Sequence, residues 1–371
     1  MGMKLVVIGA GMASGRAMEH LLDANDELYD ITLFGAEPRG NYNRIMLSPV
    51  LSGEKSYEEI VTHDADWYRA NGVDCRFGEM VTGIDRWKKV VITAKGETRY
   101  DKLLIATGSN PFIIPVPGRD LDGVMAYRDL GDVNRMLGYA GREGAKAVVI
   151  GGGLLGLEAA AGLAAQGVSV TVVHVMPHLM ERQLDQSAGF LLQRELERRG
   201  ITVLCNANTK EIAGDGHVEA VVLADGVRIE ADFVVMAVGI RPNFGLAQAS
   251  GLKYNRGLLV NDEMKTEDPE VFAIGECVEH RGTCYGLVAP LYDMAKVAAR
   301  NLLGFKEEFQ PVEISTKLKV TGCDLFSAGD FAEKPGREEI VYRDATRGIY
   351  KRLVIEDNKI IGAVMYGTSP F

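Results

Sequence analysis

Hydrophobic residues in this chain gather in short continuous runs, and a glycine-rich turn closes the first of them. This run covers residues 3–8 (MKLVVI), and a near-copy occupies residues 146–150. Uninterrupted apolar runs of this length, rich in β-branched residues, are typical of parallel strands covered on both faces. Apolar residues at helical spacing follow each turn. The pattern therefore predicts the same strand, turn and helix twice.

The elements around the two turns repeat as well. Second strands are predicted at 30–37 and 168–174, and short alternating segments in each half indicate a small antiparallel insertion. Residues 41–72 are expected to contain loop and an amphipathic helix that ends at the final glycine. A further helix is expected at about 290–303, where a proline suits the first turn.

The second glycine turn follows G-x-G-x-x-G fully and the first approximates it. This pattern binds a dinucleotide when it stands between a strand and a helix. The first glycine makes the tight turn, the second lets the backbone approach a pyrophosphate, and the third lets the helix pack closely. The helix then offers its N-terminal amides to the phosphates. Ser14 replaces the third glycine of the first turn, and its small size is expected to preserve that turn. The candidate binding residues are Gly9, Gly11, Met12, Ala13 and Ser14 in the first turn and Gly151, Gly153, Leu154, Leu155 and Gly156 in the second.

A ribose-binding acid is expected about 20 residues beyond each turn, at the end of the next strand. Glu37 fills this position in the first half, whereas the second half has His174. A histidine there can accept ribose hydroxyls, face a 2′-phosphate, or only pack at the strand end. The choice between NADH and NADPH therefore stays open.

Two dinucleotides in one chain suggest a relay in which one is consumed and the other is retained. A flavin suits the retained role, because it takes a hydride and releases single electrons. The apolar strand that ends in Gly275 and Glu276 supports this choice, since a carboxylate there can hold a ribityl chain. The alternative for this acid is an ordinary helix cap.

The predicted fold class is α/β, with two Rossmann-like three-layer dinucleotide-binding domains and a small C-terminal α+β domain. Residues 1–115 and 240–308 would form a discontinuous FAD-binding domain, and residues 116–239 the NAD(P)-binding domain. Residues 309–371, which are rich in short strands and turns, would form a C-terminal interface domain.

The net charge and the distribution of cysteines indicate which partners and which cellular compartment to expect. A net charge of −10 over 371 residues argues against nucleic acids and anionic membranes as partners. The five cysteines are scattered and include no C-x-x-C pair, which favours a reducing cytosol and predicts no metal site. No signal peptide is visible, and no apolar run approaches the ~18 residues of a membrane span. We therefore expect a cytoplasmic protein.

Five motifs resemble those of the FAD-dependent pyridine nucleotide-disulfide reductase superfamily: VVIGAGMASG, LLIATGSNP, VVIGGGLLGLEAA, VVMAVGIRPN and TEDPEVFAIGEC. The resemblance covers essentially the whole chain and implies FAD and NAD(P)H as cofactors. Disulfide members of the superfamily carry C-x4-C after the second strand, but this chain has no cysteine there, which excludes a dithiol relay from that segment. Longer segments resemble the N-terminal flavoprotein part of the large subunit of assimilatory NAD(P)H nitrite reductases, and rubredoxin and ferredoxin reductases are similar too.

The resemblance also implies roles for single residues. Arg44 would lie near the FAD phosphates, or alternatively form a surface salt bridge. Glu158 would touch the nicotinamide amide or the flavin edge, or alternatively be an exposed helix acid. The helix that starts near Val288 would direct its amides at the flavin, or only pack. Further FAD contacts are expected at Val81, Ala106, Thr107, Gly108, Arg128 and Ala289, and an NAD(P) contact at Gly239.

The activity implied is hydride transfer from NAD(P)H to FAD and then electron transfer to an iron-containing acceptor, as the reductase part of an assimilatory nitrite reductase. A stand-alone rubredoxin reductase, an NADH oxidase and a redox-sensing flavoprotein without catalytic function are the alternatives. Iron–sulfur and sirohaem centres are expected only in a longer chain, of which these residues would be a fragment. The acceptor and the oligomeric state stay open, although the C-terminal domain is the usual homodimer interface in similar proteins.

Overall fold

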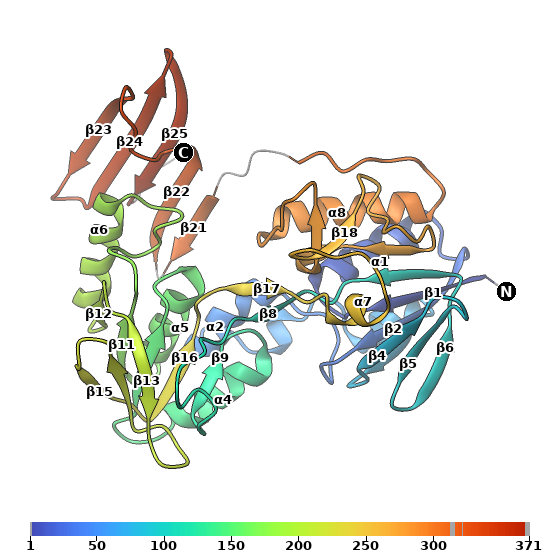
Figure 1. Cartoon of the computed structure of the whole chain (residues 1–371), viewed down its shortest axis with the longest axis horizontal. Coiled ribbons are helices and arrows are strands. Elements are labelled where there is room, and N and C mark those ends of the chain that lie inside the picture. The colour runs from blue at the N-terminus through green and yellow to red at the C-terminus, as the bar shows by residue number, and fades with distance from the viewer. Residues whose placement is uncertain (1, 312–315, 321, 368–371) are drawn as a thin grey trace. The chain divides into compact units, whose positions relative to one another are not determined.

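The computed structural model describes residues 2–311, 316–320 and 322–367, except for the side chains of 316–320 (Figure 1). Contacts divide the chain into two compact units. The first unit comprises Met1–Arg44, Tyr57–Asn110 and Ile240–Val312, and the second comprises Ile45–Ser56, Pro111–Gly239 and Glu313–Phe371. Residues 45–56, which were predicted with the first half of the chain, thus group with the second unit. The assignment of each unit to one cofactor remains a prediction.

A five-stranded parallel sheet forms the centre of the first unit. Its order is β19-β7-β1-β2-β3. The apolar run of β1 is buried in its last four residues, as a strand covered on both faces requires. The strands are β1 (Met3–Ile8), β2 (Tyr29–Gly35), β3 (Asp74–Phe77), β7 (Lys102–Ile105) and β19 (Val271–Ala273).

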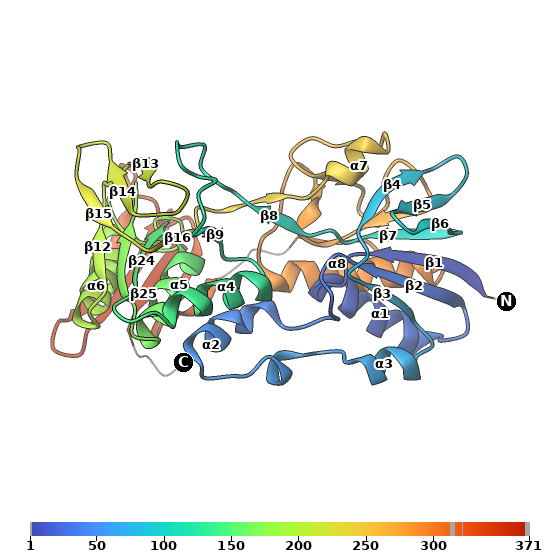
Figure 2. The ribbon, with the colours of Figure 1, turned by 90° about the horizontal axis from the view of Figure 1, so that it is seen from below.

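Helices and a small antiparallel sheet cover the two faces of this parallel sheet. Figure 2 shows helix α1 on one face and strands β4, β5 and β6 on the other, and α8 packs beside α1. One hydrophobic core joins all three layers. The covering elements are α1 (Met12–Ala24), α8 (Val288–Leu302), β4 (Val81–Asp85), β5 (Val90–Thr93) and β6 (Gly96–Arg99).

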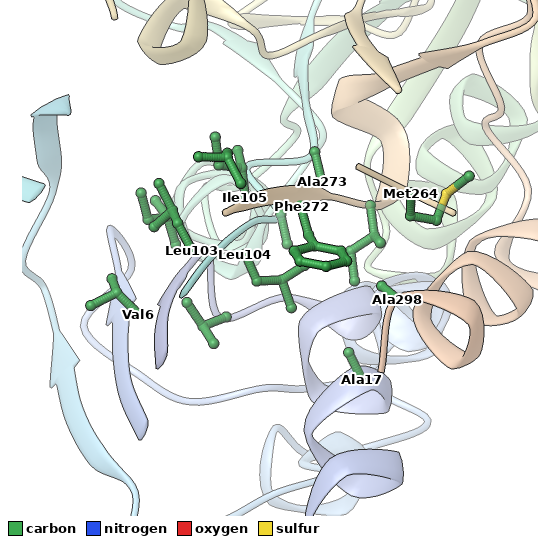
Figure 3. Packing of buried hydrophobic residues seen from close by; sticks show 14 of the residues in the cluster. Val6, Ala17, Leu103, Leu104, Ile105, Met264, Phe272, Ala273 and Ala298 are labelled. Atoms are coloured by element: carbon green, nitrogen blue, oxygen red, sulfur yellow. The ribbon is translucent and has the colours of Figure 1, made fainter. Parts of the chain in front are cut away.

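Small residues let the two helices approach the strands. Figure 3 shows Ala17 of α1 and Ala298 of α8 beneath Phe272 of β19, and all three side chains are fully or almost fully buried. Leu104 of β7 is also fully buried in this cluster. The close packing holds the ends of β1, β7 and β19 in fixed positions, which matters because the predicted binding residues follow these strands.

The second unit repeats this plan. Its parallel sheet has the order β12-β11-β10-β16-β9. The antiparallel strands β13, β14 and β15 pack on one face through a shared core, and Figure 2 shows α5 on the other. The parallel strands are β9 (Val124–Ala126), β10 (Lys146–Ile150), β11 (Ser169–Val173), β12 (Thr202–Leu204) and β16 (Phe233–Met236). The elements around them are α4 (Leu130–Ala140), α5 (Leu154–Ala165), α6 (Gln186–Arg198), β13 (Thr209–Ala213), β14 (Ala220–Leu223) and β15 (Arg228–Glu230).

Helix α2 (Leu47–Ser52) joins the second unit by packing on α5. A Cβ atom at Gly162 of α5 would lie only 2.9 Å from the Leu51 side chain, so the missing side chain permits the close crossing. The Gln166 side chain also donates a 3.0 Å hydrogen bond to the Leu51 carbonyl. The local sequence pattern of residues 45–56 does not predict these contacts.

The predicted amphipathic helix that ends at Gly72 is wrong in its length. The chain forms two short elements instead, η2 (Glu58–Ile60) and α3 (Ala65–Ala70). Val61 between them is extended and bridges to Tyr42, which interrupts the helix. Asp64 then starts α3 by accepting a 2.8 Å hydrogen bond from the Trp67 amide, as an N-cap does.

The C-terminal residues form a five-stranded antiparallel sheet with the order β21-β22-β25-β24-β23. A mixed α+β domain was predicted, but the described part of residues 309–371 contains no helix. The reason is that a helix of the second unit covers this sheet: α6 packs on β25. The strands are β21 (Thr316–Val320), β22 (Cys323–Gly329), β23 (Glu338–Asp344), β24 (Ile349–Glu356) and β25 (Lys359–Tyr366).

The remaining elements are short. None of the helices in the described ranges is long and apolar enough to cross a bilayer. The short elements are η1 (Arg44–Met46), β8 (Ser109–Pro111), β17 (Ile240–Pro242), α7 (Gly245–Ala249), β18 (Leu258–Val260), η3 (Gly275–Cys277) and β20 (Val278–His280).

Candidate dinucleotide-binding sites

The first glycines of the two turns share a backbone conformation with positive φ. Gly9 has φ +108° and Gly151 has φ +120°, values that favour glycine. A Cβ atom at Gly9 would lie 2.2 Å from the carbonyl oxygen of Ala106, and one at Gly151 would lie 2.3 Å from that of Ala237. Each glycine therefore lets its turn pass directly over the end of the neighbouring strand.

The third positions of the turns reach the same packing by different means. A Cβ atom at Gly156 would lie 2.0 Å from the carbonyl oxygen of Gly151, so only glycine fits there. In the first turn the buried hydroxyl of Ser14 lies 2.5 Å from the Gly9 carbonyl oxygen and 2.9 Å from that of Gly11. A hydrogen bond thus replaces the close contact, and the turn keeps its form.

The second glycine of each turn leaves the N-terminus of the following helix without a side-chain cap. Gly11 precedes α1 and Gly153 precedes α5, and neither glycine has a side chain that could cap the first amides. Apart from the glycine and its immediate neighbours along the chain, no described atom lies within 4 Å of a Cβ atom built at either position. Met12 and Ala13 begin α1, and Leu154 and Leu155 begin α5. These uncapped amides, with open space before them, fit a pyrophosphate.

The acid at the end of β2 is held by two neighbours. Glu37 accepts a 2.8 Å hydrogen bond from the Tyr42 hydroxyl and forms an ion pair with Arg44. The Arg44 guanidinium also lies 5.0 Å from the centre of the Tyr42 ring. Arg44 thus forms a salt bridge with a residue that is itself a predicted FAD contact, and its own position near the FAD phosphates remains a prediction.

His174 has both ring nitrogens engaged inside the second unit. The amide of Gly152 donates to Nδ1 at 3.0 Å, and Nε2 lies 3.1 Å from a carboxylate oxygen of Glu181. The side chain is buried. These contacts are those of a histidine packed at the strand end, and a contact of His174 with NAD(P) remains a prediction.

A cavity of about 320 Å³ lies at the carboxyl ends of the strands in the first unit. Gly9, Val81 and Thr107, three of the predicted FAD contacts, line it together with Asn243. The Thr107 hydroxyl donates to the Asn243 carbonyl at 2.7 Å, and the Asn243 amide donates to the Gly108 carbonyl at 2.9 Å. Ligands of open α/β sheets bind at this end of the strands.

The residues after β19 adjoin the first helix. Gly275 has φ +87°, and a Cβ atom there would lie 3.3 Å from that of Ala13. Glu276 accepts a 2.7 Å hydrogen bond from the Ser109 hydroxyl. Helix α8 begins at Val288, followed by Ala289, where its start was predicted. The N-cap residue of α8, Leu287, makes no side-chain hydrogen bond to the first amides of the helix.

Glu158 is half-buried on α5 rather than exposed. Its carboxylate accepts a 2.8 Å hydrogen bond from Ser48 of α2, whose hydroxyl lies 3.0 Å from that of Tyr127. Burial raises the pKa of Glu158, and the Ser48 hydrogen bond opposes this shift. The exposed-acid alternative is therefore wrong. Ser48 and Tyr127 were not predicted, because neighbouring residues along the chain do not indicate that they lie beside Glu158.

The other two predicted contacts lie in the second unit. The amide of Arg128 donates to the Asp132 carboxylate at 2.8 Å, next to the N-cap of α4. Gly239 has φ +114° and accepts a hydrogen bond from the Phe112 amide. No group of three metal-ligating side chains occurs within the described residues. Burial raises the pKa of Cys277, which suits a structural thiol.

Residues 3–300 match the sequence profile described as pyridine nucleotide-disulphide oxidoreductase. The chain belongs to this family. Residues 315–369 match the profile of the rubredoxin NAD+ reductase C-terminal domain. Both matches agree with the resemblance inferred from the motifs, and the first match includes both glycine turns.

Proteins of this family similar to the chain include enzymes and electron-transfer subunits. The nitrite reductase [NAD(P)H] of Bacillus subtilis is 51% identical over 100% of the chain and 46% of its own length. The assimilatory nitrate reductase electron transfer subunit of the same organism is 44% identical over 98% of the chain and 47% of its own length. The chain therefore spans about half the length of these curated relatives. The crystal structure of NADH:rubredoxin oxidoreductase from Clostridium acetobutylicum is 30% identical, with a TM-score of 0.84 over 99% of this chain and 92% of that one.

Proposed function

We propose that this chain is an FAD-dependent NAD(P)H oxidoreductase that passes electrons to an iron-containing acceptor, as the reductase part of an assimilatory nitrite reductase. The observation that carries the proposal is the duplicated turn: Gly9 and Gly151 cross their strand ends with the same geometry, and both following helices begin uncapped. Two such sites in one chain suit two dinucleotides. The names of the relatives supply the direction of electron flow.

The first unit fits FAD. The amides at the start of α1 would face its pyrophosphate, and Glu37 would accept hydrogen bonds from a ribose, with Arg44 balancing the carboxylate charge. The cavity lined by Val81 and Thr107 would hold part of the molecule. Ala106, Gly108, Gly275, Glu276, Val288 and Ala289 follow strands or begin a helix of the same unit and remain proposed contacts, as does Arg128 of the second unit. When bound, FAD accepts a hydride and releases electrons singly.

The second unit fits NAD(P)H. The amides at Leu154 and Leu155 would face the pyrophosphate, and Gly239 would leave room beside it. Ser48 fixes the orientation of the Glu158 carboxyl group, which would position the nicotinamide amide or the flavin edge. Because burial raises its pKa, Glu158 keeps its proton to a higher pH than an exposed glutamate does.

The acceptor is proposed from the relatives. One similar protein is named an NADH-rubredoxin oxidoreductase, 31% identical over 98% of this chain, and rubredoxin is an iron protein. Iron–sulfur and sirohaem centres would belong to a longer chain. A homodimer through the C-terminal sheet remains part of the proposal.

The test begins with FAD. Purified protein is reconstituted with FAD, and loss of the flavin absorbance is followed after NADH or NADPH is added. The reduced protein is then mixed with rubredoxin, ferricyanide or oxygen in a stopped-flow instrument. We expect rapid oxidation by rubredoxin and ferricyanide and slow oxidation by oxygen.

Two results would contradict the proposal. A colourless protein that refuses FAD would end it. Fast oxidation by oxygen with slow oxidation by the iron acceptors would instead identify an NADH oxidase, the name of a relative from Methanocaldococcus jannaschii that is 32% identical over 98% of this chain.

A further inference from the structure

The strand register shows which residues correspond in the two halves. Ile8 pairs with Phe34 across β1 and β2, and Ile150 pairs with Val173 across β10 and β11. The residue after Val173, His174, therefore takes the place of Gly35. By the same register the counterpart of Glu37 is Met176, three residues after Val173. The second unit thus has no acid at either position where a ribose-binding carboxylate would be expected.

Two facing positions carry the larger and the smaller residue in opposite order in the two halves. The first half has Ala10 and Gly35, and the second has Gly152 and His174. A Cβ atom at Gly35 would lie 2.9 Å from the methyl group of Ala10, so a side chain at residue 10 requires glycine at residue 35. In the second unit Gly152 replaces Ala10, and a Cβ atom there would lie 2.7 Å from the ring of His174. The imidazole occupies the space that the second turn leaves empty.

This placement fixes the tautomer of His174. Because the Gly152 amide can only donate, Nδ1 is the acceptor, and the proton of the neutral ring is on Nε2. Nε2 then donates to Glu181 at 3.1 Å. The Glu181 side chain is 26% exposed, and its other carboxylate oxygen has no partner among the residues that the structure describes. The buried His174 thus holds one carboxylate oxygen of Glu181, and the other oxygen of this partly exposed side chain is left to accept a hydrogen bond.

The backbone holds Glu181 at the same turn. Met180, the residue before it, adopts φ +53°, an uncommon conformation for a residue with a side chain. Its amide donates to the Gly152 carbonyl at 2.9 Å. The adjacent Leu179 is fully buried and packs against Gly152, where a Cβ atom would lie 2.6 Å from its side chain. The carbonyl of Gly152 therefore anchors the segment that carries Glu181 directly, and its amide does so through the His174 ring.

We propose that Glu181 is the ribose-binding carboxylate of the second unit, delivered by His174 from seven residues further along the chain, and that it makes NADH the preferred nucleotide. The inference rests on the proposed function, because it names the substrate of that site. A carboxylate accepts a hydrogen bond from the 2′-hydroxyl of NADH and repels the 2′-phosphate of NADPH.

A neighbouring cation offers the opposite specificity. Arg182 is exposed, and a guanidinium suits a 2′-phosphate. Arg182 has no partner in the described part of the chain, whereas Glu181 is anchored by a buried ring and a constrained backbone. A group held in advance loses less conformational entropy on binding, so the geometry favours the carboxylate.

The experiment measures binding without turnover. Isothermal titration of the full chain gives the Kd of ADP-ribose and of 2′-phospho-ADP-ribose for the unmodified protein, Glu181→Gln and the matched control Arg182→Gln. We expect the unmodified protein to prefer ADP-ribose, and Glu181→Gln to weaken ADP-ribose binding about tenfold, because a hydrogen bond to a charged group is lost. Arg182→Gln is expected to leave the ADP-ribose Kd within about twofold, as an exposed unpaired charge contributes little.

A second variant tests the role of His174 as a positioning residue. His174→Phe keeps an aromatic ring beneath Gly152 but cannot donate to Glu181. It should lower the preference for ADP-ribose as Glu181→Gln does, and the double variant should show no further loss. A role in stability alone would lower the melting temperature without changing the ratio of the two Kd values.

The outcomes separate the inference from the proposed function. An unchanged ratio in Glu181→Gln overturns the inference, and so does tighter binding of 2′-phospho-ADP-ribose that depends on Arg182. Binding of neither ligand also overturns it. If ADP-ribose binds through Glu181 but neither nucleotide reduces bound FAD, the inference stands and the proposed function fails.

Discussion

The carboxylate of Glu158 on α5 accepts a 2.8 Å hydrogen bond from the hydroxyl of Ser48 on α2. The two residues are 110 positions apart, and Ser48 belongs to a segment that leaves the first unit of the chain and joins the second. Tyr127, 3.0 Å from the Ser48 hydroxyl, extends the chain of polar groups. The Ser48 hydroxyl thus holds this half-buried acid directly, and the Tyr127 hydroxyl contacts Ser48 rather than the carboxylate.

Glu158→Gln should change how stability depends on pH. Burial raises the pKa of Glu158 in the folded protein above the unfolded value of about 4.3, so the protonated acid favours folding and its ionisation opposes it. The stability that Glu158 contributes is complete below the unfolded pKa and is lost as the pH rises through the folded pKa. The melting temperature of Glu158→Gln relative to the unmodified protein should therefore rise between pH 4 and pH 8. Thermal unfolding at several pH values checks this, and a constant difference would contradict it.

Arg44→Gln should weaken the binding of FAD. The substitution removes the ion pair with Glu37 and leaves the carboxylate without its cation. Because both side chains are partly exposed, we expect a modest loss of about fivefold in the Kd for FAD, measured by flavin fluorescence during reconstitution. Arg69→Gln is the control, since Arg69 pairs with Asp66 on the open surface. An equal loss in both variants would show that general charge, not the Glu37 pair, matters.

Gly153→Ala should separate nucleotide binding from stability. Gly153 has φ −83°, and no described atom lies near a Cβ atom built there, so alanine costs the fold little. The added methyl group would stand where the pyrophosphate approaches. We expect weaker binding of NADH with a melting temperature close to that of the unmodified protein. Unchanged NADH affinity by titration would place the pyrophosphate elsewhere.

Gly156→Ala should instead destabilise the second unit. A Cβ atom at this position would lie 2.0 Å from the Gly151 carbonyl oxygen, and α5 must move to admit it. Overpacking of this kind costs about 1–3 kcal/mol, which denaturant unfolding can measure. Ser14→Ala provides the contrast in the first turn, because the Cβ atom is already accommodated and only the hydroxyl contacts are lost, at about 1 kcal/mol. A larger cost for Ser14→Ala would contradict this account.

Arg352→Met should loosen the C-terminal sheet. The buried guanidinium of Arg352 on β24 contacts Asp185, which caps α6, and forms an ion pair with Glu339. Glu339 is exposed, so water can replace the guanidinium there. Asp185 keeps its hydrogen bonds from the Ala188 amide and the Tyr350 hydroxyl, so we expect a loss of about 1 kcal/mol from the guanidinium contacts. Unfolding monitored by limited proteolysis of residues 313–371 tests this. Arg347→Met is the control, since Arg347 is exposed and pairs only loosely with Asp344.

The sequence predicted the elements whose form depends on neighbouring residues. The apolar runs at 3–8 and 146–150 became β1 and β10, and the helix expected at 290–303 became α8. These elements follow from side-chain periodicity and from the positive φ of glycine, which are properties of a few consecutive residues. The same local information failed over residues 41–72, where the bridge between Tyr42 and Val61 interrupts the expected helix.

The pairing of polar side chains was decided by the tertiary structure alone. The sequence marked Glu37, His174 and Glu158 as chemically distinctive, but their partners Arg44, Glu181 and Ser48 became apparent only when strands and helices were in place. A hydrogen bond requires two groups within about 3 Å and in line, and the order of residues along the chain does not encode such distances between separate elements. The sequence by itself thus determined the family and its two glycine turns, while the tertiary structure decided which carboxylate lies near each turn.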